Sequence, residues 1–466
     1  MEKKYFYFGK SICARANSRL NNETIAALWK GFCHQSGFLV MEEIDDICFR
    51  AGPIGIPEVP EGKEFAVQVT EQGIAVAAKD YSGLARGLMV LMMRIEAVDL
   101  TEGCEQFRIE TCQLESNYSI KTRMIHFCVF PETTPAFLKK CIRLAGTMQY
   151  THVVLEFWGM LQFDCLKELA WENAYSKEFA RSLVKEIKAM GMQAIPMFNH
   201  MGHAAAARVS SGKHVVLDQN PRLATLFAPD GWSWNIGAEP VKALMEAIRQ
   251  ELYEVFDDPE YFHLGCDEIF SYDETEASMS LVENYLRELT RTVIREGKRP
   301  IVWGDMMLHP ETCGVEKPYY CGCNVPEKAA KLLKALAPET VIGDWQYDVK
   351  EAPIKTSVYL KEQGFDVLGV SWLVPDNAEA HMKTVKDYDL MGVMVTTWHT
   401  LAQHMPHIVT NALLYGAYHS PWSGEGGNQI STETATLLRK VCFVEGKYED
   451  SGWTDFQIFL HANPTT

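Results

Sequence analysis

The stretch YFHLGCDE, residues 261–268, ends an apolar run on two adjacent carboxylates, Asp267 and Glu268. Adjacent acids are an unfavourable end for a buried strand, because a carboxylate that leaves water needs a partner. A site that uses both acids explains them, and a solvated strand end is the alternative. We therefore place the chemistry of the chain at this pair.

Short apolar runs alternate with amphipathic helical patterns on both sides of this stretch. The predicted strands are 124–129, 153–157, 193–198, 261–264, 300–303, 340–342, 367–371 and 392–396, and the helical patterns include 137–147, 179–190, 241–256 and 278–295. Eight such units predict an α/β fold, a (β/α)8 barrel of the TIM type, whose catalytic side chains lie at the carboxyl ends of its strands. Asp267 and Glu268 follow the fourth strand and would lie on that face.

Residues 1–117 predict a small α/β domain that precedes the barrel. Runs 65–69 and 74–78 flank a turn that contains Gly73, which predicts a β-hairpin, and 84–93 carries apolar residues at helical spacing. Polar groups do not converge in this part, so we expect a scaffold. The barrel is expected over 118–420, and 421–466 is expected to add a helix and a tail packed on it.

Charge and cysteine usage limit the partners. The formal charge of −17 is spread over the chain, so neither nucleic acid nor a membrane is expected as a partner. The first residues lack the apolar core of a signal peptide, and no run approaches the ~18 apolar residues of a membrane helix, so a cytoplasmic protein is expected. The thirteen cysteines are scattered, which predicts reduced thiols and no metal, and a homodimer is left open.

Tryptophans follow four of the later predicted strands. One tryptophan alone would be read as core, but four at equivalent positions predict flat walls for a sugar ring, because an indole N–H there lies near solvent. Asp376 is added as a polar contact of the same site. Trp232 and Trp234, in the long connection 199–237, either line the site or pack the loop. The four strand-end tryptophans are Trp303, Trp345, Trp372 and Trp398.

The adjacency of the two acids constrains their roles. Neighbouring residues that leave a strand point in different directions, so they cannot be the facing pair of an ordinary retaining glycosidase, whose carboxyl groups are ~5 Å apart. One division of labour has Glu268 protonating the leaving oxygen while Asp267 holds a group of the substrate. That arrangement suits a sugar that carries its own nucleophile, such as a 2-acetamido group.

Three segments carry a resemblance to a known family. HLGCDE, residues 263–268, resembles the H-x-G-x-D-E motif of glycoside hydrolase family 20, the β-N-acetylhexosaminidases. AIPMFNHMGH, residues 194–203, resembles the family's I-P-E-x-D-x-P-G-H stretch, and VWGD, residues 302–305, resembles its next strand. The similarity covers most of residues 60–400. It implies a TIM-type barrel that cleaves small amino-sugar oligosaccharides or glycosides without a cofactor.

The resemblance also implies roles for single residues. Asp267 would accept the acetamido N–H and orient the carbonyl oxygen for attack, and Glu268 would act as general acid and then general base around an oxazolinium intermediate. His203 matches the histidine that supports the glutamate, and His263 is either a second supporting group or a packing residue. Arg123 falls where the family places an arginine on the sugar's O3 and O4 hydroxyls. The implied aromatic walls are Trp303, Trp345 and Trp398.

Departures from the family pattern leave the specificity open. They concentrate at the pocket rim, where contacts to O4 distinguish N-acetylglucosamine from N-acetylgalactosamine. Two functions remain: an exo-acting β-N-acetylhexosaminidase with unusual specificity, and an amino-sugar-binding protein that has lost turnover. His399 is either a sugar contact or a loop residue. The departing positions are Glu156, Gly159, Met197, Asn199, Met201 and Thr400.

Overall fold

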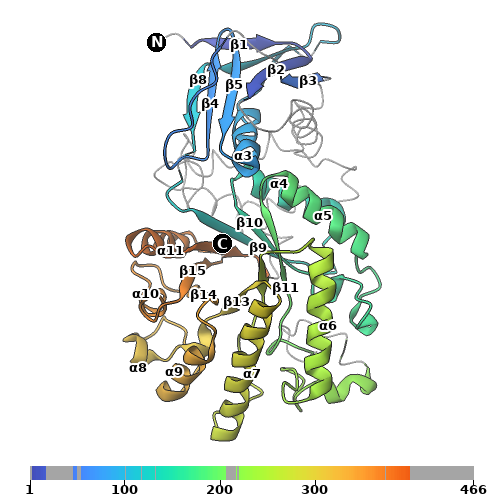
Figure 1. Cartoon of the computed structure of the whole chain (residues 1–466), viewed down its shortest axis with the longest axis vertical. Coiled ribbons are helices and arrows are strands. Elements are labelled where there is room, and N and C mark those ends of the chain that lie inside the picture. Colours follow the sequence, from blue (N-terminus) through green and yellow to red (C-terminus); the bar gives the residue numbers. More distant parts are fainter. Residues whose placement is uncertain are drawn as a thin grey trace, which may run out of the picture.

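The computed structural model describes residues 3–16, 46–49, 54–99, 101–116, 118–131, 133–205, 217, 220–372 and 374–398. The expected C-terminal helix and tail, His399 and Thr400 lie outside these residues. Figure 1 shows a sheet-rich amino-terminal part at one end of the molecule and the α/β barrel at the other. Within the described residues, none of the helices combines the length and the apolar character that crossing a membrane requires.

The amino-terminal part contains two sheets and one helix. The predicted hairpin is present as β4 (Phe65–Thr70) and β5 (Gly73–Ala78), and α3 (Tyr81–Met92) packs against it. The five-stranded sheet runs β3 (Asp46–Phe49), β2 (Ser11–Ala16), β5, β4, β8 (Cys112–Glu115), and the three-stranded sheet runs β1 (Tyr5–Phe8), β7 (Gln106–Glu110), β6 (Glu96–Asp99).

In the described residues, eight parallel strands close the barrel in chain order, with β9 pairing β16. Each predicted barrel strand is present with its ends within a few residues of the prediction, so the predicted fold class is confirmed. The side chains inside the barrel are mainly apolar, including Met124, Val154, Ile301 and Leu368. The strands are β9 (Thr122–Cys128), β10 (His152–Glu156), β11 (Gln193–Met197), β12 (Tyr261–His263), β13 (Arg299–Trp303), β14 (Val341–Trp345), β15 (Asp366–Ser371) and β16 (Gly392–Thr396).

The helices follow their strands and cover the outside of the barrel. Their starts obey local rules: Thr134, Ser176 and Thr275 are N-caps whose hydroxyls accept a backbone N–H of the first turn. Proline occupies the first turn of several others, where its missing N–H is not needed. The helices are α4 (Pro135–Thr147), α5 (Lys177–Ala189), α6 (Glu239–Val255), α7 (Glu276–Arg295), α8 (Pro310–Cys313), α9 (Pro326–Ala335), α10 (Lys355–Glu362) and α11 (Pro375–Asp387).

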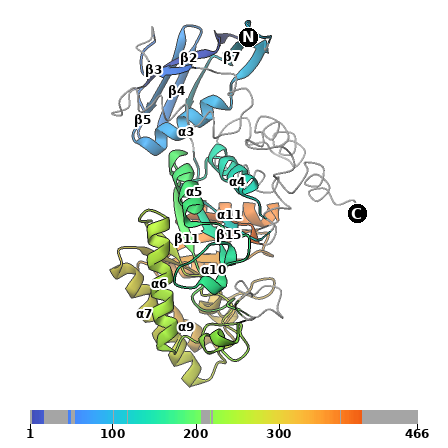
Figure 2. The ribbon, with the colours of Figure 1, turned by 90° about the vertical axis from the view of Figure 1, so that its right-hand side faces the viewer.

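Helix α3 joins the small domain to the amino ends of the barrel strands. The Tyr81 hydroxyl donates to the Ala189 carbonyl at 2.8 Å, and Nη1 of Arg86 donates to the Gly191 carbonyl at 3.0 Å. Ala189 is the last residue of α5, and Gly191 lies in the turn that leads to β11. Figures 1 and 2 show α3 between the sheet and helices α4 and α5. The carboxyl ends of the strands therefore lie on the side away from the small domain.

Arg123 belongs to this junction, which corrects its predicted role as a sugar ligand. Its Nε donates to the Gln149 carbonyl, its Nη1 donates to the carbonyls of Ile120 and Lys121, and its guanidinium lies 3.9 Å from the ring centre of Tyr118. Burial lowers its pKa to about 10. Arg123 is the second residue of β9, and the carboxyl end of that strand is about 16 Å further on. An arginine at the strand start therefore cannot reach the other end of the barrel.

Candidate active site

Asp267 and Glu268 lie just beyond β12, at the carboxyl end of the barrel. They differ in exposure: 6% of the Asp267 side chain is exposed, against 26% of the Glu268 side chain. The Glu268 backbone N–H donates to Oδ2 of Asp305 at 3.0 Å, and its carbonyl accepts the indole N–H of Trp232 at 2.6 Å. One acid is thus enclosed, while its neighbour can be reached from solvent.

His203 connects the two acids. Its Nε2 lies 3.1 Å from Oδ2 of Asp267 and 3.2 Å from Oε2 of Glu268. On the other side of Asp267, Nδ2 of Asn199 donates to Oδ1 at 3.3 Å. His203 and Asn199 both follow β11, so the loop after the third strand sets the orientation of the acids that follow the fourth.

Two motif glycines allow these loops to approach each other. A Cβ atom at Gly265, whose φ is +69°, would lie 2.6 Å from Nδ2 of Asn199. A Cβ atom at Gly202 would lie 2.3 Å from the carbonyl oxygen of Asp267. Both distances are far shorter than a carbon contact permits. The glycines of the two family-like motifs are therefore explained by close packing of the loops after β11 and β12.

The backbone at the site is strained at several residues other than glycine. Positive φ angles occur at His203 (58°), Cys266 (69°) and Glu268 (45°), and at Trp398 (43°) beyond β16. Residues with side chains rarely adopt this region, and they do so where surrounding packing holds them. The strain coincides with residues that are predicted to carry or support the chemistry.

Asp305 is a third acidic residue, and it lies behind Asp267 and Glu268. It follows β13 and is buried. Burial and the neighbouring Asp267 carboxylate raise the pKa of Asp305 well above its ordinary value. A neutral carboxyl group behind the pair fixes the Glu268 backbone without adding a further negative charge.

The structure brings all four strand-end tryptophans into one aromatic group, which is joined by Tyr347. The rings of Trp303 and Trp398 are 5.7 Å apart, and Nε1 of Trp398 donates to the Tyr347 hydroxyl at 2.9 Å. Tyr347 also lies 5.4 Å from Trp345 and 5.7 Å from Trp372. These residues lie at the ends of β13 to β16. Trp303 is fully buried there, and the role of the group as walls for a sugar stays a prediction.

Tyr320 closes this aromatic group on the side of the acids, and it was not among the predicted site residues. It stacks on Trp345 at 4.6 Å. Burial, with Asp305, Glu268 and Asp267 nearby, raises its pKa. Tyr320 lies in an irregular segment between α8 and α9, where neither periodicity nor a motif marks it. Its spatial relation to the acids appears only in the folded chain.

The indole N–H groups of two tryptophans point to a polar ligand. Nε1 of Trp303 and Nε1 of Trp345 are buried and have no hydrogen-bond partner among the described residues. Buried indole donors are usually paired. A sugar hydroxyl or carbonyl oxygen that entered the aromatic group could accept from them.

The remaining predicted residues are less directly placed. Nδ1 of His263 accepts the Gly265 N–H at 3.1 Å, and its ring lies 4.2 Å from that of Trp303, so it supports the loop and packs below the aromatic group. Asp376 is exposed in the first turn of α11, and its contact with substrate stays a prediction. Trp232 and Trp234 are buried and donate to backbone carbonyls of the site, which favours loop packing over a sugar wall.

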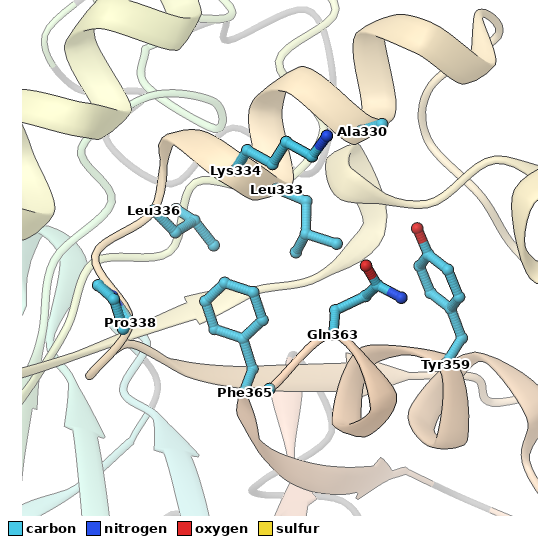
Figure 3. Close-up of a pocket in the computed structure, with 9 residues that line it drawn as sticks. Ala330, Leu333, Lys334, Leu336, Pro338, Tyr359, Gln363 and Phe365 are labelled. Atoms are coloured by element: carbon cyan, nitrogen blue, oxygen red, sulfur yellow. The ribbon is translucent and has the colours of Figure 1, made fainter.

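A separate hollow lies between α9 and α10 (Figure 3). Leu336 and Pro338 follow the end of α9, and Gln363 and Phe365 follow the end of α10, so this hollow is at the amino ends of β14 and β15. Its lining contains no acid, histidine or cysteine. It is remote from the carboxylate pair, and the titratable side chains in its lining are Lys334 and Tyr359.

A (β/α)8 barrel with carboxylates at the carboxyl ends of its strands and tryptophans beside them is an arrangement that suits a glycoside hydrolase. Residues 151–369 match the family model described as glycosyl hydrolase family 20, catalytic domain. This part of the barrel therefore matches the catalytic domain of that family, as a divergent member. A comparison with curated proteins found no match.

Solved structures of the family share the fold at low identity. The exo β-N-acetylglucosaminidase of Vibrio harveyi, in complex with N-acetylglucosamine, superposes with a TM-score of 0.69 at 13% identity, covering 97% of this chain and 77% of that one. The β-N-acetylhexosaminidase of Bacteroides fragilis gives 0.64 at 15% identity, covering 97% and 94%. That of Streptomyces coelicolor gives 0.65 at 12% identity, covering 97% and 96%.

Proposed function

We propose that this protein is an exo-acting, retaining β-N-acetylhexosaminidase in which the 2-acetamido group of the substrate is the nucleophile. Glu268 acts as general acid and then as general base, and Asp267 accepts the acetamido N–H. The observation that carries the proposal is the position of His203, within 3.2 Å of both carboxylates. One imidazole that contacts both adjacent acids fixes the orientation of each side chain. Two acids held in fixed, separate orientations suit a division of roles.

The exposure of the acids matches this division. The enclosed Asp267 suits a group that binds and orients the acetamide, since a buried carboxylate makes strong, directional hydrogen bonds. Glu268 is the more exposed acid, which suits a group that must reach the leaving oxygen and later a water molecule. In a substrate-assisted reaction no second carboxylate has to face Glu268 across the scissile bond.

The aromatic group supplies binding energy and excludes water. Trp345 and Trp398 are partly exposed beside the buried Trp303, and a pyranose ring or an acetamide methyl packs well on such flat apolar faces. The named activities of the structural relatives, an exo β-N-acetylglucosaminidase and β-N-acetylhexosaminidases, support a terminal amino sugar as the substrate. Epimer preference depends on the rim and is left to measurement.

The test uses p-nitrophenyl β-glycosides of N-acetylglucosamine and N-acetylgalactosamine, together with a β-linked disaccharide of N-acetylglucosamine. We expect turnover of at least one aryl glycoside. Glu268→Gln is expected to lower kcat by about 10²–10⁴-fold on the disaccharide and by less on the aryl glycoside, because p-nitrophenolate needs little protonation. Glu260→Gln, an exposed acid before the same strand, is the matched control and should leave kcat unchanged.

A second function has a specific motivation, namely the altered rim of the pocket. A protein that binds amino sugars without turnover would bind an oxazoline-mimicking inhibitor in a calorimeter yet release no p-nitrophenol. Turnover of the disaccharide that falls by the stated factor in Glu268→Gln supports the hydrolase. Inhibitor binding without turnover supports the binding protein, and the absence of both contradicts each proposal.

A further inference from the structure

A cluster of three potential metal ligands lies inside the barrel, next to the aromatic group. His126 and Cys128 are two residues apart on β9, and Glu156 is the last residue of the adjacent β10. In the strand register His126 is opposite Val154 and Cys128 is opposite Glu156. Since side chains alternate along a strand and Val154 faces the barrel interior, all three cluster side chains face inward as well.

The three donor atoms converge on one point. Nε2 of His126 lies 3.0 Å from Oε2 of Glu156, Sγ of Cys128 lies 3.1 Å from the same oxygen, and Sγ lies 3.5 Å from Nε2. A tetrahedral Zn²⁺, with about 2.0 Å to nitrogen and oxygen and about 2.3 Å to sulfur, keeps its ligand atoms about 3.3–3.6 Å apart. The observed triangle differs from that by a few tenths of an ångström.

The connectivity argues against a nucleophile–histidine–acid relay. In such a relay the nucleophile and the acid contact opposite nitrogens of the imidazole. Here the thiol and the carboxylate are both near Nε2 of His126, and Sγ of Cys128 is further from Nδ1, at 4.0 Å. Three groups around one point are the arrangement of a metal site rather than of a proton chain.

Burial and ligand chemistry favour a divalent cation. Both His126 and Cys128 are fully buried and Glu156 is 1% exposed. A buried carboxylate and a thiolate are stabilised by a cation that lies between them. Imidazole, thiolate and carboxylate together are a donor set that suits Zn²⁺, and three protein ligands leave one coordination position for another oxygen.

The cluster borders the proposed substrate site. The His126 ring packs edge-on against Trp398 at 4.9 Å and against Trp303 at 6.2 Å. Trp398 in turn donates to the Tyr347 hydroxyl at 2.9 Å, so the cluster adjoins the aromatic group.

We propose that His126, Cys128 and Glu156 bind one Zn²⁺ beside the aromatic group of the active site, with a fourth position available to a water or a substrate oxygen. This departs from the expectation that the chain holds no metal. It gives a function to Glu156, which is one of the positions that depart from the family pattern. It does not rest on the proposed glycosidase activity, because metal binding is measured without substrate.

The test is metal binding to the full-length protein after treatment with a chelator. We expect calorimetry to give one equivalent of Zn²⁺. Co²⁺ is expected to produce a thiolate-to-cobalt charge-transfer band and the visible bands of a tetrahedral site. Cys128→Ser should abolish the charge-transfer band and weaken Zn²⁺ binding by more than about 100-fold, since loss of a ligand exceeds the effect of an outer partner.

Two further variants keep the outcome decisive. Cys141→Ser, at a buried cysteine in α4, is the matched control and should retain the charge-transfer band and the affinity. Glu156→Gln keeps the shape of the side chain, so it should stay folded and bind Zn²⁺ more weakly. Substoichiometric binding to the native protein would overturn the proposal, as would a charge-transfer band that survives Cys128→Ser or disappears in Cys141→Ser.

Discussion

Oδ2 of Asp305 lies 3.0 Å from the backbone nitrogen of Glu268 and accepts its N–H, so a buried carboxyl group beyond β13 fixes the proposed catalytic acid beyond the neighbouring β12. Burial and Asp267 keep this carboxyl group neutral to a higher pH than usual. The function of Asp305 is therefore to accept a hydrogen bond, which an uncharged side chain can also do.

Substitutions at Asp305 should show whether the site needs its hydrogen-bond acceptor or its negative charge. Asp305→Asn retains an acceptor oxygen and is expected to keep kcat/KM within about threefold of the native value, whereas Asp305→Leu is expected to lower it by about 10–100-fold. Steady-state kinetics on the aryl glycoside measure both. Equal losses in the two variants would show that a carboxylate charge, rather than an acceptor, is required.

His203 is expected to act on turnover more than on binding. Its Nε2 is close to both acids, so His203→Ala removes the group that orients them and leaves two carboxylates to repel each other. We expect kcat to fall by about 10–100-fold with a smaller change in KM. A rise in KM at unchanged kcat would instead make His203 a simple binding residue.

Arg123 is expected to matter for stability and not for catalysis. Arg123→Met leaves three backbone carbonyls without their charged donor and should lower the free energy of unfolding by about 3 kcal/mol, measured by urea denaturation. The kcat of the remaining folded protein should be unchanged. A native unfolding curve combined with a large rise in KM would return Arg123 to the substrate site.

His200 gives the stability a defined pH dependence. Its Nδ1 lies 2.7 Å from the Phe198 carbonyl, and its Nε2 accepts from Nη1 of Arg249, so it is held neutral. Burial and Arg249 lower its pKa from 6.5 to about 3. Below pH 6.5, His200 becomes protonated in the unfolded chain but stays neutral in the folded chain. The free energy of unfolding therefore falls by about 1.4 kcal/mol per pH unit, down to a pH of about 3.

His200→Gln removes this term. The free energy of unfolding of both proteins is measured near pH 7.5 and near pH 5. The value for the native protein minus the value for the variant should be about 2 kcal/mol lower at pH 5 than at pH 7.5. The same difference in unfolding free energy at both pH values would mean that His200 titrates normally in the folded state.

Much of the barrel was predictable because buried parallel strands are continuous apolar runs. Asp267 and Glu268 could be located from the sequence, since acids at the end of such a run need a reason. The tryptophans were predictable for the same reason, as each ends a strand or follows one. Strand position is a local property, so side chains at strand ends could be assigned to one face without a structure.

The remaining features depend on phase and on contacts between distant segments. Arg123 matched a family position by sequence order, but its place at the start of β9 directs it to the amino end of the barrel. Tyr320 lies in an irregular segment, so no periodic pattern marks its place beside the acids. A Cβ atom at Gly159 would lie 2.6 Å from Trp171, and this packing between distant residues explains the glycine only in the folded chain. His126 and Cys128 are two residues apart on a strand, so their side chains share a face. Inspection of the cysteine spacing alone did not reveal this pairing.

The most direct test of the central claim, attack by the substrate's own acetamide, is the rate of hydrolysis of p-nitrophenyl β-glycosides whose acetyl group is successively fluorinated. Fluorine withdraws electrons from the carbonyl oxygen and weakens it as a nucleophile. The account predicts that kcat/KM of the native protein falls steeply with each added fluorine. Rates that do not depend on fluorination would contradict it, because the acetamide would then take no part in bond formation.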